Sequence, residues 1–123
     1  MKTTLNAETL HAYVGEKGLI KALSSEFGSS VKIKIFFPEN VCQLPIEELN
    51  LSNRGYNSLK RCSIDYIEDL ICKIENGDLY SIRNLGKKSV VEIKTKLLEF
   101  VYNSLSKERQ LEFLSAIIED NAN

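Results

Sequence analysis

The stretch IRNLGKKSVVEI, residues 82–93, gathers cationic side chains around one glycine. Arg83 precedes the glycine, and Lys87, Lys88 and Ser89 follow it where a helical pattern begins. The first N–H groups of a helix have no intrahelical partner, and the positive end of its dipole faces the preceding turn. Such a turn is an anion site, and a DNA phosphate is the anion we favour. Two lysines in a first helical turn work against the dipole, which indicates that they serve a ligand.

A second basic cluster lies within residues 51–62, where Arg54, Lys60 and Arg61 occur without an acid. The whole sequence of 123 residues has a formal net charge of only −1, so its acids collect elsewhere. One basic cluster alone is usually a solvated helix face. Two such clusters in one small unit, each at the start of an expected helix, favour binding of a polyanion instead.

Residue types that carry out catalysis form no recognisable arrangement. The single histidine, His11, lacks the neighbouring ligands or carboxylates of a metal or catalytic site. The cysteines are odd in number and show no CxxC spacing, which predicts free thiols; they are Cys42, Cys62 and Cys72. No G-x-S-x-G, Walker-type loop or HExxH motif occurs. We therefore expect no enzymatic activity, no cofactor and no metal.

The composition predicts an ordinary folded domain. Hydrophobic residues make up 43% of the sequence and charged residues 27%, which is typical of soluble globular proteins. No apolar run is long enough to span a bilayer, and the first residues lack the apolar core of a signal peptide. These features predict a cytoplasmic protein with no membrane partner.

Residues 1–40 are expected to form a small α/β amino-terminal extension. A helical pattern covers residues 7–27, weakened by Gly15 and Gly18, and Gly28 is expected to end it.

Apolar and cationic residues then alternate in VKIKIFF, which predicts a strand at Val31–Phe37. A single strand leaves its edge unpaired, so it needs a partner. We expect either another strand within residues 1–40 or the same strand of a second copy, which would make a homodimer.

Residues 41–103 are expected to form a compact, all-α bundle of short helices. One piece begins near Pro45, one covers residues 54–62, one follows Ser63 as its N-cap, and one covers residues 79–86. A longer amphipathic helix over residues 87–103 carries an apolar face of Val90, Ile93, Leu97 and Val101.

Residues 104–123 are expected to add a terminal amphipathic helix. Its apolar face includes Leu111, Leu114 and Ile118, and we expect it to pack on the helical domain through the last two. The predicted fold class is therefore mainly α, with the small α/β extension at the amino end.

Two motifs closely resemble the carboxy-terminal domain of the bacterial RNA polymerase alpha subunit. The first is IEELNLSNRGYNSLKRCSIDYIEDL, residues 46–70, and the second is NLGKKSVVEIKTKL, residues 84–97. The resemblance covers roughly residues 45–100. It implies a compact helical bundle that contains a helix-hairpin-helix, binds the minor groove of A·T-rich DNA, and docks transcription activators.

The resemblance also implies roles for individual residues. By motif position, Arg54 resembles the arginine that enters the minor groove, and Asn57 resembles its DNA-contacting neighbour. A narrow A·T minor groove has an enhanced negative potential, which suits an inserted arginine. The hairpin residues are expected at the phosphates. The expected DNA-binding set is Arg54, Asn57, Asn84, Gly86, Lys87, Lys88 and Ser89.

Three residues depart from the family's usual pattern. Asn53 stands where valine is usual, Gly55 where serine is common, and Ser58 where cysteine is usual. Gly55 predicts a looser helix under the groove-entering arginine, and so weaker binding. Residues 1–40 are too few for the alpha subunit's large amino-terminal domain, so we expect a stand-alone relative of the carboxy-terminal domain.

Two functions from different classes follow. The leading hypothesis is a non-enzymatic DNA-binding module connected with transcription. The alternative is a protein-docking module that uses the same scaffold to bind a transcription factor or a polymerase component. The near-neutral net charge favours the alternative somewhat, because dedicated DNA-binding domains are commonly basic. A salt titration against A·T-rich duplex separates the two.

Overall fold

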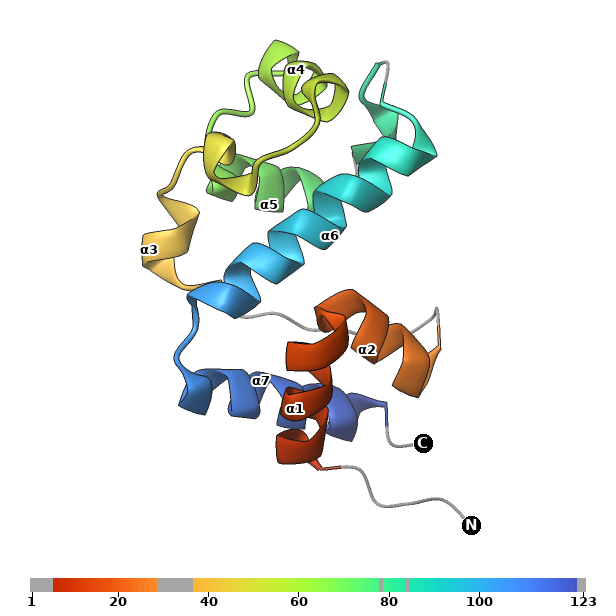
Figure 1. Ribbon diagram of the computed structural model, residues 1–123. Coiled ribbons are helices and arrows are strands. Elements are labelled where there is room, and N and C mark those ends of the chain that lie inside the picture. Colours follow the sequence, from red (N-terminus) through yellow and green to blue (C-terminus); the bar gives the residue numbers. More distant parts are fainter. Residues whose placement is uncertain (1–5, 29–36, 78, 84, 122–123) are drawn as a thin grey trace. The chain divides into compact units, whose positions relative to one another are not determined.

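The computed structural model describes residues 6–28, 37–77, 79–83 and 85–121. Within these ranges the regular elements are all helices, joined by turns, and no strand is present (Figure 1). The mainly α fold class is therefore confirmed. None of the described helices is long and apolar enough to cross a membrane.

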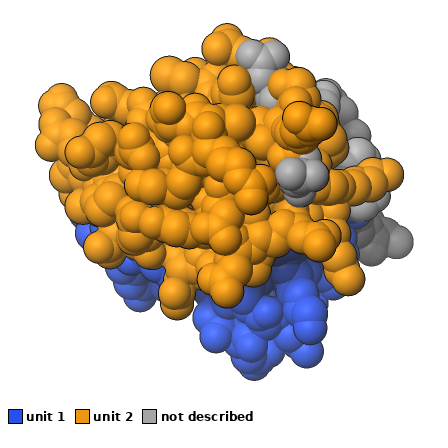
Figure 2. Space-filling view, turned by 90° about the horizontal axis from the view of Figure 1, so that it is seen from above, with its two compact units in different colours: residues 1–36, 102–123 blue, residues 37–101 orange. Residues whose placement is uncertain are grey.

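The protein forms two compact units, which Figure 2 colours separately. Unit 1 combines residues 1–36 with residues 102–123, and unit 2 comprises residues 37–101. The long helix α6, Lys87–Ser104, belongs to unit 2 up to Val101.

Unit 1 contains α1 (Ala7–Lys17), α2 (Leu19–Phe27) and α7 (Lys107–Asp120). The expected single helix over residues 7–27 is interrupted at Gly18, whose φ of 95° is incompatible with a continuing helix. Such a φ is easily adopted only by glycine. Gly28 ends α2, as predicted.

The expected α/β character of residues 1–40 finds no support. Residues 6–28 are helical, and the proposed strand Val31–Phe37 lies outside the described residues except for Phe37, which is in irregular backbone. Pairing of two copies through this segment therefore stays a prediction.

Helix α7 packs on α1 within unit 1. Its N-cap, Ser106, accepts a hydrogen bond from the backbone N of Arg109 at 3.3 Å. Leu114 is fully buried, as expected, but its buried companion is Ile117 and not Ile118, which is half-buried. The buried face of α7 is thus turned by one residue from the face that we predicted.

Unit 2 is a bundle of short helices closed by α6. Its other elements are α3 (Glu39–Cys42), the 3₁₀ helix η1 (Ile46–Leu49), α4 (Asn53–Arg61), α5 (Ile67–Glu75) and the 3₁₀ helix η2 (Leu79–Ser81). The core is made of branched aliphatic side chains, among them Ile46, Leu59, Ile67, Leu70 and Ile93, all without exposed surface.

The predicted N-cap of α5 is wrong. Ser63 lies in the turn after α4 with a positive φ of 62°, and the helix begins only at Ile67 with Tyr66 as its N-cap. The Asp69 carboxylate accepts a hydrogen bond from the backbone N of Tyr66 at 3.1 Å and so satisfies a donor at the helix start.

Candidate nucleic-acid interface

The start of α4 is fastened to α6 by one carboxylate. Glu92 accepts hydrogen bonds from the backbone N of Ser52 at 3.0 Å and from the Ser52 hydroxyl at 2.9 Å. A carboxylate at a helix N-terminus is favourable because it meets the positive end of the helix dipole. This contact holds the helix that carries Arg54 in place.

Gly55 is buried where α4 faces α6. A Cβ at this position would meet Glu92 Oε1 at 3.4 Å and Ile93 Cδ1 at 3.7 Å, which are ordinary contacts. A Cβ therefore fits at this position. Glu92 fixes the start of the same helix through Ser52, and the loosening expected from Gly55 stays a prediction.

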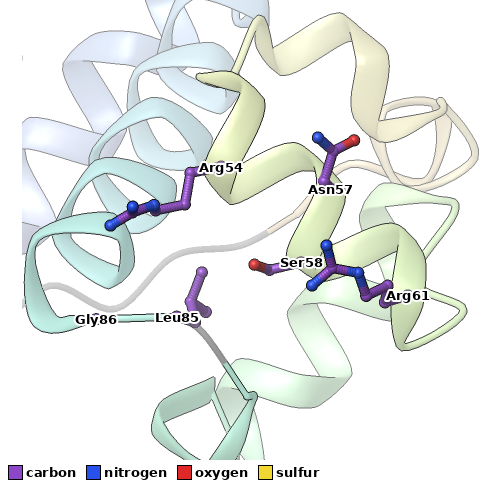
Figure 3. A pocket seen from close by; sticks show the side chains of 6 residues that line it. All are labelled: Arg54, Asn57, Ser58, Arg61, Leu85 and Gly86. Carbon is purple, nitrogen blue, oxygen red and sulfur yellow. The ribbon is translucent and has the colours of Figure 1, made fainter.

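An open pocket of about 590 Å³ lies between α4 and the turn that precedes α6 (Figure 3). Its lining is Arg54, Asn57, Ser58, Arg61, Leu85 and Gly86. Both charged side chains of this lining are arginines, and no carboxylate is part of it. The pocket is therefore suited to an anion.

The α4 residues of this lining share one face of the helix. They occur at spacings of three, four and seven residues from Arg54, which places them in one row. In Figure 3 Arg54 and Arg61 lie at the two ends of this row, while Leu85 and Gly86 belong to the opposite wall. Both arginines are exposed, whereas Ser58 is only 3% exposed.

Gly86 does not have the conformation that a glycine turn predicts. The glycines with positive φ are Gly18, Gly28 and Gly77, and Gly86 is not among them. A Cβ at Gly86 would meet no atom of the described residues within 4 Å. Neither the backbone nor the packing of the described residues therefore requires glycine here, and the missing side chain leaves room for an outside group to approach the backbone.

Helix α6 begins directly after this glycine. The carbonyl of Gly86 accepts the hydrogen bond of the Val90 N–H at 3.0 Å, which closes the first turn. The N–H groups of residues 87–89 therefore precede the intrahelical ladder and are available to an anion.

The cations within residues 51–62 separate into two kinds. Lys60 forms ion pairs with Asp65 at 2.8 Å and Glu47 at 3.7 Å. The hydrogen bond to Asp65 is the main cause of the raised pKa of Lys60. Arg54 and Arg61 form no ion pair with a described residue and are exposed in the pocket. Only the two arginines are thus available to a ligand.

The lysines of α6 also separate into two kinds. Lys94 Nζ lies 5.4 Å from the centre of the Tyr80 ring, and Lys96 donates a hydrogen bond to the backbone oxygen of Asn50 at 2.8 Å. Lys87 and Lys88 are exposed, and neither forms an ion pair with a described residue.

The structure therefore brings Arg54, Asn57 and Gly86 of the expected DNA-binding set to one pocket. Lys87, Lys88 and the half-buried Ser89 follow on the first turn of α6 without lining the pocket. Asn84 lies outside the described residues.

Sequence reasoning missed Ser58, Arg61 and Leu85 as lining residues. The helical spacing from Arg54 was the signal that would have found the first two, since residues four and seven positions later lie on the same helix face.

The described residues offer no other chemical site of the kinds that the sequence raises. None of their histidine, cysteine, aspartate and glutamate side chains gather in a group of three that could hold a metal. His11 Nε2 forms a hydrogen bond with Gln110 Oε1 at 2.8 Å inside unit 1, which gives it a structural partner. The three cysteines are free.

Comparisons with known proteins match unit 2. The family model for the carboxy-terminal domain of the bacterial RNA polymerase alpha subunit matches residues 38–99. The DNA-directed RNA polymerase subunit alpha of Bacillus velezensis is 49% identical over 61 residues, which are 50% of this protein and 19% of the relative. The subunit alpha of Acidothermus cellulolyticus is 54% identical over 56 residues, 46% of this protein and 16% of the relative.

The subunit alpha of Carboxydothermus hydrogenoformans is 49% identical over 59 residues, 48% of this protein and 18% of the relative. The matched part thus spans less than a fifth of the length of these relatives. No solved structure gave a significant match.

Proposed function

Because this protein belongs to the family of the carboxy-terminal domain of the bacterial RNA polymerase alpha subunit, we propose that it is a non-enzymatic DNA-binding module related to transcription. It reads the A·T-rich minor groove through Arg54 and binds phosphates through the hairpin at Gly86. Its partners are A·T-rich duplex DNA together with RNA polymerase or transcription regulators.

Arg54 is suited to enter a minor groove. It projects from the first turn of α4, is exposed, and has no acidic partner among the described residues. An A·T tract narrows the minor groove and strengthens its negative potential, which attracts an arginine. Glu92 holds the start of α4 through two hydrogen bonds from Ser52, which fixes the backbone that carries Arg54.

The turn at Gly86 is suited to a phosphate. Free N–H groups at the start of α6, the positive end of its dipole and the exposed Lys87 and Lys88 all favour an anion. The space that a Cβ would fill at Gly86 is open, so a phosphate oxygen can reach the backbone. Ser89 supplies a hydroxyl in the same turn.

A single observation carries this proposal: the lining of the pocket between α4 and the Gly86 turn combines two arginines with an amide and a hydroxyl, and contains no acid. The protein is nearly neutral, but the lining of this pocket contains no acidic side chain. This local excess of positive charge favours binding of a polyanion in spite of the net charge. Few phosphate contacts make such binding weak and strongly dependent on salt.

The second candidate is a protein-docking module, favoured by the presence of unit 1. This unit lies outside the residues that match the family, so it offers a surface that the family domain itself does not have. In this reading the scaffold of unit 2 contacts a transcription factor or a polymerase component.

Fluorescence anisotropy with two duplexes of equal length, one A·T-rich and one G·C-rich, at two salt concentrations tests the proposal. We expect the parent to prefer the A·T-rich duplex, Arg54→Ala to lose that preference, and Lys88→Ala to bind both duplexes more weakly while keeping the preference. The docking module replaces our proposal if the parent binds neither duplex at low salt.

A further inference from the structure

We propose that unit 1 binds a basic segment of a partner protein, and that a lysine or arginine side chain of this segment enters a groove between α1 and α2. The groove belongs to the part of the chain that precedes the residues matched by the family. The inference goes beyond the proposed function, because DNA binding by unit 2 does not require it.

The groove is open and has a volume of about 310 Å³. It lies where α1 packs on α2 within unit 1. The residues that α1 contributes are spaced by three, four and seven positions from Thr9, which places them on one face of the helix. The lining is Thr9, Ala12, Tyr13 and Glu16 of α1 with Glu26 of α2.

Both charged side chains of this lining are glutamates. Glu16 and Glu26 are exposed, and neither forms an ion pair with a described residue. Glu26 lies in the last turn of α2, which has no basic residue, so its carboxylate meets the negative end of the helix dipole. A cation in the groove would offset this unfavourable position. Charge complementarity therefore favours a cationic occupant.

Tyr13 supplies an aromatic surface for the same cation. Its hydroxyl donates a hydrogen bond to Ser25 Oγ at 3.0 Å, which fixes the ring against α2. The side chain is half-buried, so part of the ring stays accessible in the groove. The face of an aromatic ring attracts an ammonium or guanidinium group. The ring and the two carboxylates together are suited to a long cationic side chain, whose methylene groups can pack on Ala12.

The length of the groove favours a protein segment over a small cation. Thr9 and Glu16 are separated by about 10.5 Å along the axis of α1. A single ammonium group covers only part of this distance, whereas a stretch of chain with a lysine or arginine side chain covers all of it. The two carboxylates repel phosphates, so the groove is not a further site for nucleic acid.

The test is an NMR titration of the full-length protein with a short peptide of alternating lysine and alanine. A peptide with glutamine in place of lysine is the control for charge. At low salt, where exposed charges are least screened, we expect the lysine peptide to shift the backbone amide signals of α1 and α2, and the glutamine peptide to leave them unchanged. The absence of these shifts, or equal shifts on α7, would overturn the proposal.

Two double variants separate a local contact from general electrostatics. Glu16→Gln with Glu26→Gln removes both carboxylates of the groove, and we expect a severalfold weaker affinity for the lysine peptide. Glu112→Gln with Glu119→Gln changes the net charge by the same amount on α7, where both residues are exposed and outside the groove lining. This control should bind nearly like the parent. Equal losses in the two double variants would overturn the groove as the site.

Variants of Tyr13 test the aromatic contact. Tyr13→Phe keeps the ring and removes the hydrogen bond to Ser25, whereas Tyr13→Leu removes both. We expect Tyr13→Phe to bind the lysine peptide like the parent and Tyr13→Leu to bind it about two- to fivefold more weakly, as for an exposed cation–π contact. Equal affinities of the two variants would overturn the role of the ring. Circular dichroism confirms that each variant is folded.

A competition experiment tests the kind of occupant. Spermidine is a small polyamine cation without a peptide backbone, and we expect it to displace the lysine peptide only at a large excess. Displacement at equal concentration would assign the groove to a small cation and overturn the protein segment. A parent that binds no duplex would overturn the proposed function and leave this inference unaffected.

Discussion

The two units differ in the surroundings of particular polar side chains. In unit 1 the polar contacts are internal, as when Gln110 joins His11 at 2.8 Å and donates to the backbone oxygen of Tyr102 at 2.9 Å. In unit 2 Arg54 and Arg61 stay exposed in a pocket without acids. The polar groups of this pair in unit 1 thus contact each other, whereas the two arginines of unit 2 have no ionic partner among the described residues.

The comparison also separates two uses of glycine. Gly18 of unit 1 has a φ of 95°, which the backbone needs in order to pass from α1 to α2. Gly86 of unit 2 has no such φ, and a Cβ there would meet no described atom within 4 Å. A glycine that the fold does not require is a better indicator of a binding surface than a glycine that shapes the backbone.

The largest expected effect concerns the core of unit 1. We expect Ile117→Ala to lower the free energy of unfolding by about 2–5 kcal/mol, because Ile117 is 1% exposed and its truncation leaves a cavity. Ile118→Ala is the matched control, since the same change at the half-buried neighbour creates less of a cavity. Urea unfolding measures both variants.

The same pair of variants tests whether unit 1 takes part in DNA binding. Under conditions in which both remain folded, we expect them to bind A·T-rich duplex like the parent. Weaker binding by folded Ile117→Ala would contradict the division of roles between the units. Equal destabilisation by the two variants would contradict the assignment of the buried face of α7.

The next effect concerns the two glycines. Gly18→Ala should cost about 1–3 kcal/mol of stability, since alanine is strained at a positive φ, and it should leave DNA binding unchanged. Gly86→Ala should leave stability within about 0.5 kcal/mol and weaken DNA binding at both salt concentrations. Thermal unfolding measures the stability of both variants, and anisotropy measures their DNA affinity. A Gly86→Ala variant that is destabilised but binds DNA normally would contradict the prediction.

The sequence predicted the long elements of this fold better than the turns. Helices α6 and α7 follow from sustained apolar periodicity. The break at Gly18 and the left-handed turn at Ser63 were missed, because apolar spacing does not report the sign of φ. The cap of α5 by Asp69 depends on a side-chain position that spacing alone does not reveal.

The candidate site was predicted in part. The motifs led to Arg54, Asn57 and Gly86, which share the pocket, and their binding roles stay predictions. Arg61 was missed because a count of cations gives it the same weight as Lys60. Only the tertiary pairing of Lys60 with Asp65 and Glu47 distinguishes these two neighbours.

A smaller loss of stability is expected at the start of α4, the helix that carries Arg54. Glu92→Gln replaces a charged acceptor of two hydrogen bonds from Ser52 by a neutral one. We expect a loss of about 1 kcal/mol in stability, as for other helix caps, and faster hydrogen exchange in the first turn of α4. DNA affinity should fall slightly although a negative charge is removed. Tighter binding would show that Glu92 acts mainly by repelling DNA.

The smallest effect is a pH dependence on the surface of unit 2, where Tyr56 donates a hydrogen bond to Glu47 at 2.5 Å. This bond is the main cause of the lowered pKa of Glu47 and of the raised pKa of Tyr56. A carboxyl whose pKa is lower in the folded state stabilises the fold above its unfolded pKa, and this contribution disappears as the pH falls through the folded value. A tyrosine with a raised pKa stabilises the fold below its unfolded pKa and loses the contribution as the pH rises through the folded value.

Tyr56→Phe should therefore lower stability near neutral pH and reduce the loss of stability that the parent shows on acidification. Urea unfolding of parent and variant at neutral pH and at about pH 3, below the ordinary carboxyl range, measures the difference. Parallel pH profiles for the two proteins would mean that this exposed contact adds nothing to the stability of unit 2.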